Sequence, residues 1–228
     1  VLGSLIERDY RWVAKRSPQL VRDIHAAGHE VACHGLTHRT VYTQTPEVFR
    51  AETSEAKQRL EDATGVPVRG YRAATYSITA RSLWALDILE ELGFSYDSSI
   101  FPIRHDLYGI PGSPRFAYRA ASGSLLEVPI TTVEYLGQRL PAGGGGYFRL
   151  LPYALFRAAV RRVNTRDRQA AVFYCHPWEI DPGQPRVAGV SAKSRFRHYT
   201  NLDRMESRLR RLLRDFRWGR MDEVFGVG

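Results

Sequence analysis

Short apolar runs alternate along this chain with stretches whose apolar residues have helical spacing. The short segments that we interpret as strands are residues 30–33, 68–71, 94–96 and 170–175, and only the last is apolar throughout. The stretches with helical spacing are residues 17–28, 45–65, 79–93 and 152–163. Proline or threonine begins each of them, and glycine closes the first three, as is typical of helices. Strands that alternate with helices favour parallel βαβ units, so the pattern predicts an α/β fold.

The middle and the end of the chain depart from this alternation. Residues 101–146 are rich in proline and glycine, with strand-like pieces at Phe116–Tyr118 and Leu125–Ile130. The run Gly143–Gly146 lacks the Lys-Ser/Thr pair of a phosphate loop, so we interpret it as a flexible surface turn. Residues 201–218 have apolar positions at helical spacing, with arginines on the other face. They predict a terminal helix packed on the domain, and a membrane-surface or partner-binding helix is the alternative.

Four predicted strands end on, or just before, a chemically capable side chain. These side chains are His34, Arg72, Asp97 and His176. Because the carboxyl ends of parallel strands open on one face, we expect the four to gather around one pocket. His34 also forms a His-x-x-x-His pair with His38, and neutral imidazole is a common zinc ligand. The sequence therefore predicts a divalent-metal site, most simply for zinc.

Each of these residues also has a purely structural interpretation. Asp97 can cap the turn that follows it, Arg72 can form a surface ion pair, and His176 can be a core histidine bonded to backbone. Cys33 and Cys175 each precede a candidate histidine, which raises a Cys/His zinc site as an alternative. Neighbouring side chains of a strand point to opposite faces, so buried, reduced thiols are the favoured interpretation.

Composition narrows the class of protein only modestly. The 228 residues are 43% hydrophobic, enough for one large domain with or without an appendage. The net charge of +9 suits an acidic partner, yet no nucleic-acid motif accompanies it, so we expect no nucleic acid as partner. A basic module that binds nucleic acid or an anionic membrane stays an alternative. We expect no transmembrane segment and no signal peptide, which slightly favours the cytoplasm without determining the compartment.

Four ordered motifs resemble those of the polysaccharide deacetylase family, the NodB-homology carbohydrate esterases. The motifs are Gly28–His38, Arg72–Tyr76, Tyr96–Pro102 and Phe173–Glu179. Gly144–Pro152 further resembles a bacterial branch associated with exopolysaccharide and exosortase loci, which carries a C-terminal extension. The resemblance covers nearly the whole chain from about Trp12 onward.

This resemblance implies a deformed (β/α) barrel and a metal-dependent hydrolase that removes N-acetyl groups from a polysaccharide. Such an enzyme cleaves a linear amide bond with the help of a divalent metal, usually zinc. His34 and His38 are the protein ligands that the resemblance implies. An N-acetylated polysaccharide is then the expected substrate.

The resemblance also implies the other roles at the site. His176 is the general acid that protonates the leaving amine, and Asp97 orients its imidazole. Arg72 orients the catalytic base. Thr75 and Tyr76 face substrate, and the backbone N–H near Thr75 helps to stabilise the oxyanion.

The chain departs from the family pattern at its start. The family's Asp-Asp pair, which supplies the base and a third metal ligand, does not occur in this sequence. Val1–Gly3 resembles the end of the second strand, so we expect the barrel to lack its first strand and helix, with Ser4–Arg11 as an insertion. We predict an N-terminally incomplete deacetylase-like domain at 1–180 and a C-terminal extension at 181–228. Because the pair is missing, a non-catalytic glycan-binding relative is the first alternative to the enzyme.

Overall fold

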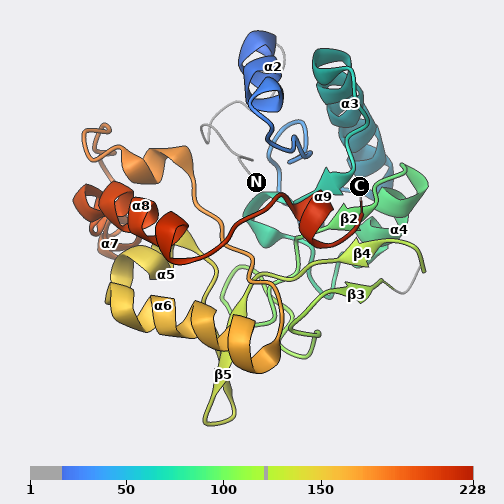
Figure 1. The fold of residues 1–228 in the computed structure, drawn as a ribbon. Helices are drawn as coiled ribbons and strands as arrows, with labels where there is room; N and C mark the ends of the chain where they lie inside the picture. Colours follow the sequence, from blue (N-terminus) through green and yellow to red (C-terminus); the bar gives the residue numbers. More distant parts are fainter. Residues whose placement is uncertain (1–16, 121–122, 228) are drawn as a thin grey trace. The chain divides into compact units, whose positions relative to one another are not determined.

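The computed structural model describes residues 17–120 and 123–227, which form two compact units (Figure 1). Unit 1 consists of two segments, one that ends at Ile130 and one that begins at Gly219. Unit 2 is Thr131–Trp218. The boundary predicted at residue 180 falls inside unit 2, and the division into a domain and an extension stays a prediction. The predictions for Val1–Gly3 and Ser4–Arg11 lie outside the described residues.

Unit 1 holds most of the strand–helix alternation. Its helices and short helical turns are α2 (Pro18–Ala26), η2 (Val41–Thr43), α3 (Pro46–Thr64), η3 (Ala74–Tyr76), α4 (Trp84–Glu91) and α9 (Met221–Val224). Its strands are β1 (Gly70–Tyr71), β2 (Tyr96–Asp97), β3 (Tyr118–Arg119) and β4 (Leu126–Glu127).

The helices of unit 1 begin and end largely where the sequence predicts. The hydroxyl of Thr45 accepts the N–H of Val48 at the start of α3, and Gly65 ends that helix in the left-handed conformation. The third helix begins later than predicted. Thr79 and Ser82 first close a turn, in which the Ser82 hydroxyl accepts the Thr79 N–H, and α4 starts two residues after it.

The sheet of unit 1 has the order β1-β2-β4-β3. β1, β2 and β4 are parallel, and β3 pairs with β4 in antiparallel fashion, as Figure 1 shows. The strand predicted at 30–33 is reduced to one parallel bridge, Cys33 to Tyr71. Aromatic side chains pack beside this edge: Phe49 meets Tyr71 edge to face at 5.8 Å between ring centroids. The predicted α/β class is confirmed.

Unit 2 combines one hairpin with helices. Its elements are β5 (Thr132–Tyr135), β6 (Gln138–Pro141), α5 (Gly145–Leu150), α6 (Tyr153–Arg162), η4 (Val163–Asp167), η5 (Pro177–Ile180), α7 (Ala192–Tyr199), η6 (Leu202–Arg204) and α8 (Met205–Asp215). Met205 and Leu212 of α8 are fully buried against Phe148 and Phe156. The apolar face predicted for the tail therefore packs inside unit 2.

The glycine run of unit 2 is not the surface turn that the sequence predicts. Gly143–Gly145 are buried, and the carbonyl of Gly143 accepts the N–H of Tyr174. The strand predicted at 170–175 is reduced to the parallel bridge between Gly144 and Tyr174. A Cβ at Gly144 would overlap the ring of Tyr174, and a Cβ at Gly145 would overlap the carboxylate of Glu179. Within the described part of the chain, no helix is long and apolar enough to cross a membrane.

Candidate functional site

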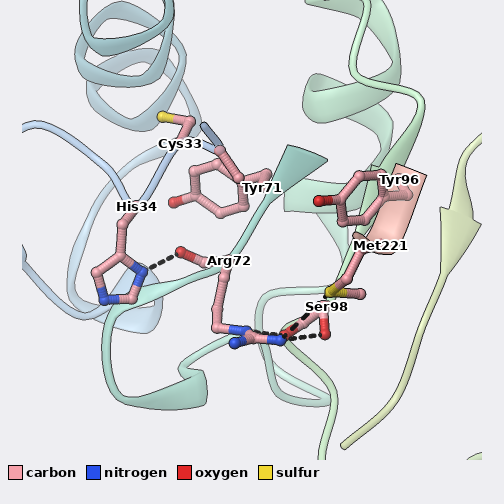
Figure 2. A pocket seen from close by; sticks show the side chains of 8 residues that line it. Cys33, His34, Tyr71, Arg72, Tyr96, Ser98 and Met221 are labelled. Atoms are coloured by element: carbon pink, nitrogen blue, oxygen red, sulfur yellow. Dashed lines mark hydrogen bonds between the residues drawn. The ribbon is translucent and has the colours of Figure 1, made fainter. Parts of the chain in front are cut away.

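The parallel register of unit 1 brings three predicted site residues to one edge of the sheet. The N–H of Arg72 bonds to the carbonyl of Cys33, and the N–H of Ser98 bonds to the carbonyl of Tyr71. His34, Arg72 and Asp97 therefore lie at the carboxyl ends of neighbouring strand segments. Figure 2 shows the ring of His34 beside the backbone of Arg72.

One hydrogen bond orients the imidazole of His34. Its Nδ1 lies 2.6 Å from the backbone carbonyl oxygen of Arg72 (Figure 2). A carbonyl oxygen only accepts, so in the neutral ring Nδ1 carries the proton and Nε2 keeps the lone pair. A backbone carbonyl on one ring nitrogen is the usual support for a histidine whose other nitrogen binds a metal.

The ring of His38 lies 5.1 Å from that of His34, centroid to centroid. Two imidazoles bound through nitrogen to one tetrahedral ion have centroids roughly 5 Å apart, so the pair fits two ligand positions. His38 has φ 53°, a left-handed conformation that side chains rarely adopt. Among the described residues, no group of three or more His, Cys, Asp or Glu side chains could hold a metal. Of the described residues, the two imidazoles of this pair could therefore hold a metal.

Arg72 is buried beside the pair but holds no carboxylate. Its guanidinium donates to the backbone oxygen of Ser98 at 2.9 Å and to the Ser98 hydroxyl at 2.7 Å. None of the described acidic side chains forms an ion pair with it. The cavity next to it, which also touches His34 and Met221, has a volume of about 10 Å³ and is too small for a sugar.

The segment after Arg72 carries two strained residues. Thr75 and Tyr76 have φ 55° and 52°, and such strain is found at functional sites more often than elsewhere. The turn bonds come from the N–H groups of Tyr76 and Ser77. The N–H of Thr75 comes before these two in the turn. N–H groups in the first turn of a helix have no carbonyl acceptor within the helix. This geometry suits the predicted oxyanion donor.

Asp97 is fully buried and pairs with a second carboxyl, that of Glu127. The two residues are in register on the parallel strands β2 and β4. Burial raises the pKa of Asp97, and burial together with the nearby Asp97 raises the pKa of Glu127 strongly. The hydroxyl of Ser99 donates to Asp97 at 2.6 Å. One proton shared by the two carboxyls would remove their repulsion in this dry setting, where Oε2 of Glu127 has no hydrogen-bond partner among the described residues.

The two cysteines have the buried character that the sequence favours. Both are free thiols, and burial raises the pKa of Cys33 to about 12 and that of Cys175 to about 11. Figure 2 shows the thiol of Cys33 pointing away from the ring of His34, so Cys33 does not join the histidine pair.

His176 lies in unit 2 and has a carboxylate partner there. Its Nδ1 is 3.3 Å from Oε2 of Glu179, and its backbone N–H donates to the same oxygen at 2.8 Å. The imidazole is 31% exposed whereas the Glu179 side chain is 2% exposed. The ring also stacks on Trp178, with 5.6 Å between centroids. The predicted contact with Asp97 joins residues of the two units and stays a prediction.

A buried ion pair holds Glu179 in place. The guanidinium of Arg149 donates to Glu179 at 2.9 Å and to backbone carbonyls of Arg197 and His198. Burial raises the pKa of Glu179, but the hydrogen bonds from His176 and the charge of Arg149 outweigh it and lower that pKa below its ordinary value. Gly145 completes this pocket, because a Cβ there would overlap the Glu179 carboxylate.

Sequence reasoning missed Glu127, Arg149 and Glu179. A signal existed for Glu127, a lone carboxylate within the apolar run 125–130. Glu179 stands three residues after His176, the spacing at which a side chain reaches back to the start of a helical turn. Arg149 gave no signal among the many arginines of this chain.

Two family models divide the chain between them. The model described as polysaccharide deacetylase matches residues 1–96, and the domain of unknown function (DUF3473) matches residues 98–226. No curated protein matches the chain.

Solved structures resemble the fold. A structure described as a polysaccharide deacetylase from Mycobacterium smegmatis has a TM-score of 0.50 at 24% identity, over 83% of this chain and 61% of that one. Another, from Pseudomonas aeruginosa PAO1, has a TM-score of 0.59 at 15% identity, and the match covers 96% of this chain and 65% of that one. The structure of an allantoinase has a TM-score of 0.54 at 15% identity, and the match covers 95% of this chain and 64% of that one. The chain thus spans under two thirds of the length of these structures.

At these identities the likeness establishes the fold alone. The deacetylase model ends just before Asp97 and covers less than half of the chain, whereas the second model covers more than half of it. The chain therefore belongs to the family of the domain of unknown function (DUF3473), and its residues 1–96 match the polysaccharide deacetylase model.

Proposed function

We propose that this chain is the catalytic region of a metal-dependent hydrolase that removes N-acetyl groups from a polysaccharide. The observation that carries the proposal is the histidine pair: the Arg72 carbonyl holds Nδ1 of His34, and His38 lies 5.1 Å away. This arrangement suits two neutral imidazoles that present nitrogen lone pairs to one ion. The resemblance to the exopolysaccharide-associated branch points to a bacterial exopolysaccharide as substrate.

His34 and His38 would hold a divalent metal, most simply zinc, with further ligands from outside the described residues or from solvent. When bound there, such an ion supplies Lewis-acid activation of the acetamide and of water. The backbone N–H at Thr75 would donate to the oxygen that gains charge as the acetyl carbon becomes tetrahedral. Arg72 fixes this region through its two bonds to Ser98.

His176 would donate a proton to the leaving amine. The Glu179 carboxylate beside Nδ1 fixes the orientation of the ring, so that Nε2 would face substrate. Because Glu179 is 2% exposed and paired with Arg149, it stays ionised and fixed. Glu179 thereby acts as a positioning residue inside unit 2.

The test is acetate release from an N-acetylated oligosaccharide by the full chain, with zinc content measured in parallel. The proposal predicts release that a chelator abolishes and zinc restores. Acetate release that persists in a metal-free preparation of the protein would contradict it.

A non-catalytic glycan-binding relative is the second candidate. It is favoured by one observation, that the described residues give the histidine pair no third ligand. The same assay separates the two candidates: this one predicts oligosaccharide binding without bound zinc and without acetate release.

A further inference from the structure

We infer that a surface hollow in unit 1 binds a sugar unit of the glycan chain next to the one that reacts, an inference that rests on the proposed function. The hollow has a volume of about 390 Å³. That volume is within the range of small-molecule sites. The residues that line it include Tyr42, Arg81, His105, Asp106, Leu107 and Tyr108.

The hollow adjoins two of the motifs already described. Tyr42 follows His38 by four residues, and the N–H of neighbouring Val41 donates to the Ser77 hydroxyl at 2.9 Å. On the other side, the ring of Tyr108 lies 5.6 Å from that of Tyr76. A sugar in the hollow would therefore lie beside the loops that carry His38 and Tyr76.

Two backbone hydrogen bonds and one glycine shape the loop that forms one wall. The carbonyl of Phe101 accepts the N–H groups of both Ile103 and Ile110, which closes the loop at its base. Gly109 has φ 101°, and a Cβ there would overlap the carbonyl oxygen of Ile103. This shape of the wall therefore requires glycine at position 109.

The lining chemistry fits a neutral, hydroxyl-rich ring. Tyr42 is 37% exposed, and an exposed aromatic ring suits the apolar face of a pyranose. The rings of His105 and Tyr108 stack on each other at 3.8 Å between centroids and form part of the wall. Arg81 offers guanidinium donors for sugar hydroxyls, and Asp106, whose Oδ1 lies 3.0 Å from Nδ1 of His105, offers carboxylate acceptors. Hydroxyls both donate and accept, so this lining favours a sugar over a phosphate, which the Asp106 carboxylate would repel.

The experiment measures binding as a function of chain length. Fully N-acetylated chito-oligosaccharides of one, two, four and six sugars are titrated calorimetrically into the full chain, its Tyr42→Ala and Arg81→Ala variants, and matched controls. The controls are Tyr135→Ala, on the exposed hairpin of unit 2, and Arg59→Ala, on the surface of α3.

The wild type is expected to bind longer oligosaccharides more tightly. Each hollow variant is expected to lose about tenfold on the tetramer and hexamer, the size of one charge-assisted hydrogen bond for Arg81 and of one aromatic contact for Tyr42. The controls keep the wild-type length dependence. An unchanged length dependence in both hollow variants, or none in the wild type, would overturn the inference. Binding through the hollow without acetate release would instead overturn the proposed function alone.

Discussion

His34 in unit 1 and His176 in unit 2 are the same side chain in two different settings. The Nδ1 of His34 faces a backbone carbonyl, whereas the Nδ1 of His176 faces a buried carboxylate. A neutral acceptor fixes the tautomer and leaves a lone pair on Nε2. A carboxylate acceptor likewise makes Nδ1 the donor, but it places a negative charge beside the ring. The two rings thus differ in the charge of the partner on Nδ1, and we propose different roles for them.

The buried carboxyls of the two units differ in the same way. Glu179 faces Arg149 and His176, which lower its pKa and keep it charged. Glu127 faces Asp97, and burial together with this neighbour raises its pKa strongly. One unit therefore buries a charged carboxylate, and the other buries two carboxyls whose pKa values are raised. Neighbours, not burial alone, decide the charge state of a buried acid.

The largest effect is expected from His176→Ala. Loss of the general acid should lower kcat roughly 10²- to 10⁴-fold while the zinc content stays that of the wild type. Acetate release and bound zinc are measured on the same preparation, with exposed His29→Ala as the control. Turnover retained in the His176 variant would show that His176 is not the general acid.

Glu179→Gln should have the next largest effect. The amide keeps the shape of the side chain but loses the charge, so kcat should fall roughly 10- to 100-fold with KM little changed, as when a functional histidine loses its carboxylate partner. The pH profile of kcat should shift on the limb that reports the acid. Glu206→Gln, on the surface of α8, is the matched control. An unshifted profile with a lowered melting temperature would reduce Glu179 to a structural role.

Gly145→Ala tests the space around that carboxylate. The added Cβ overlaps Glu179, and the expected cost is about 1–3 kcal/mol in the free energy of unfolding. Gly146→Ala is the control next to it, because nothing lies within 4 Å of a Cβ there. Denaturant unfolding of both variants measures the difference. Equal stability of the two would show that Glu179 does not need the glycine.

Glu127→Gln should change the pH dependence of stability. The folded protein holds a proton that an unfolded glutamate releases, so this stabilisation is present in acid and declines as pH rises above the ordinary glutamate range. The slope reaches at most about 1.4 kcal/mol per pH unit, and an amide should reduce it. Unfolding free energies between pH 4 and 8 measure the slope, with Glu55→Gln on α3 as control. Identical slopes in wild type and variant would argue against the shared proton.

The sequence predicts secondary-structure elements better than it predicts which side chains contact one another. Thr45, Gly65 and the apolar runs determine local structure, so the helix bounds and the parallel pairing follow from them. His34 and Arg72 meet because their strands are neighbours, which the periodicity also implies. The partner of His176 depends on Arg149, a residue 27 positions away that no local pattern marks. The role of the buried glycines could not be predicted for the same reason. They leave space for side chains that lie elsewhere in the sequence, and no local pattern marks those side chains.

Zinc titration of three proteins tests the central claim most directly. Metal-free wild type, His34→Ala and His176→Ala are titrated with zinc in a calorimeter at neutral pH. We expect His34→Ala to lose the zinc binding seen in the wild type and His176→Ala to keep it. Zinc binding that survives in His34→Ala and disappears in His176→Ala would contradict the assignment of ligand and acid.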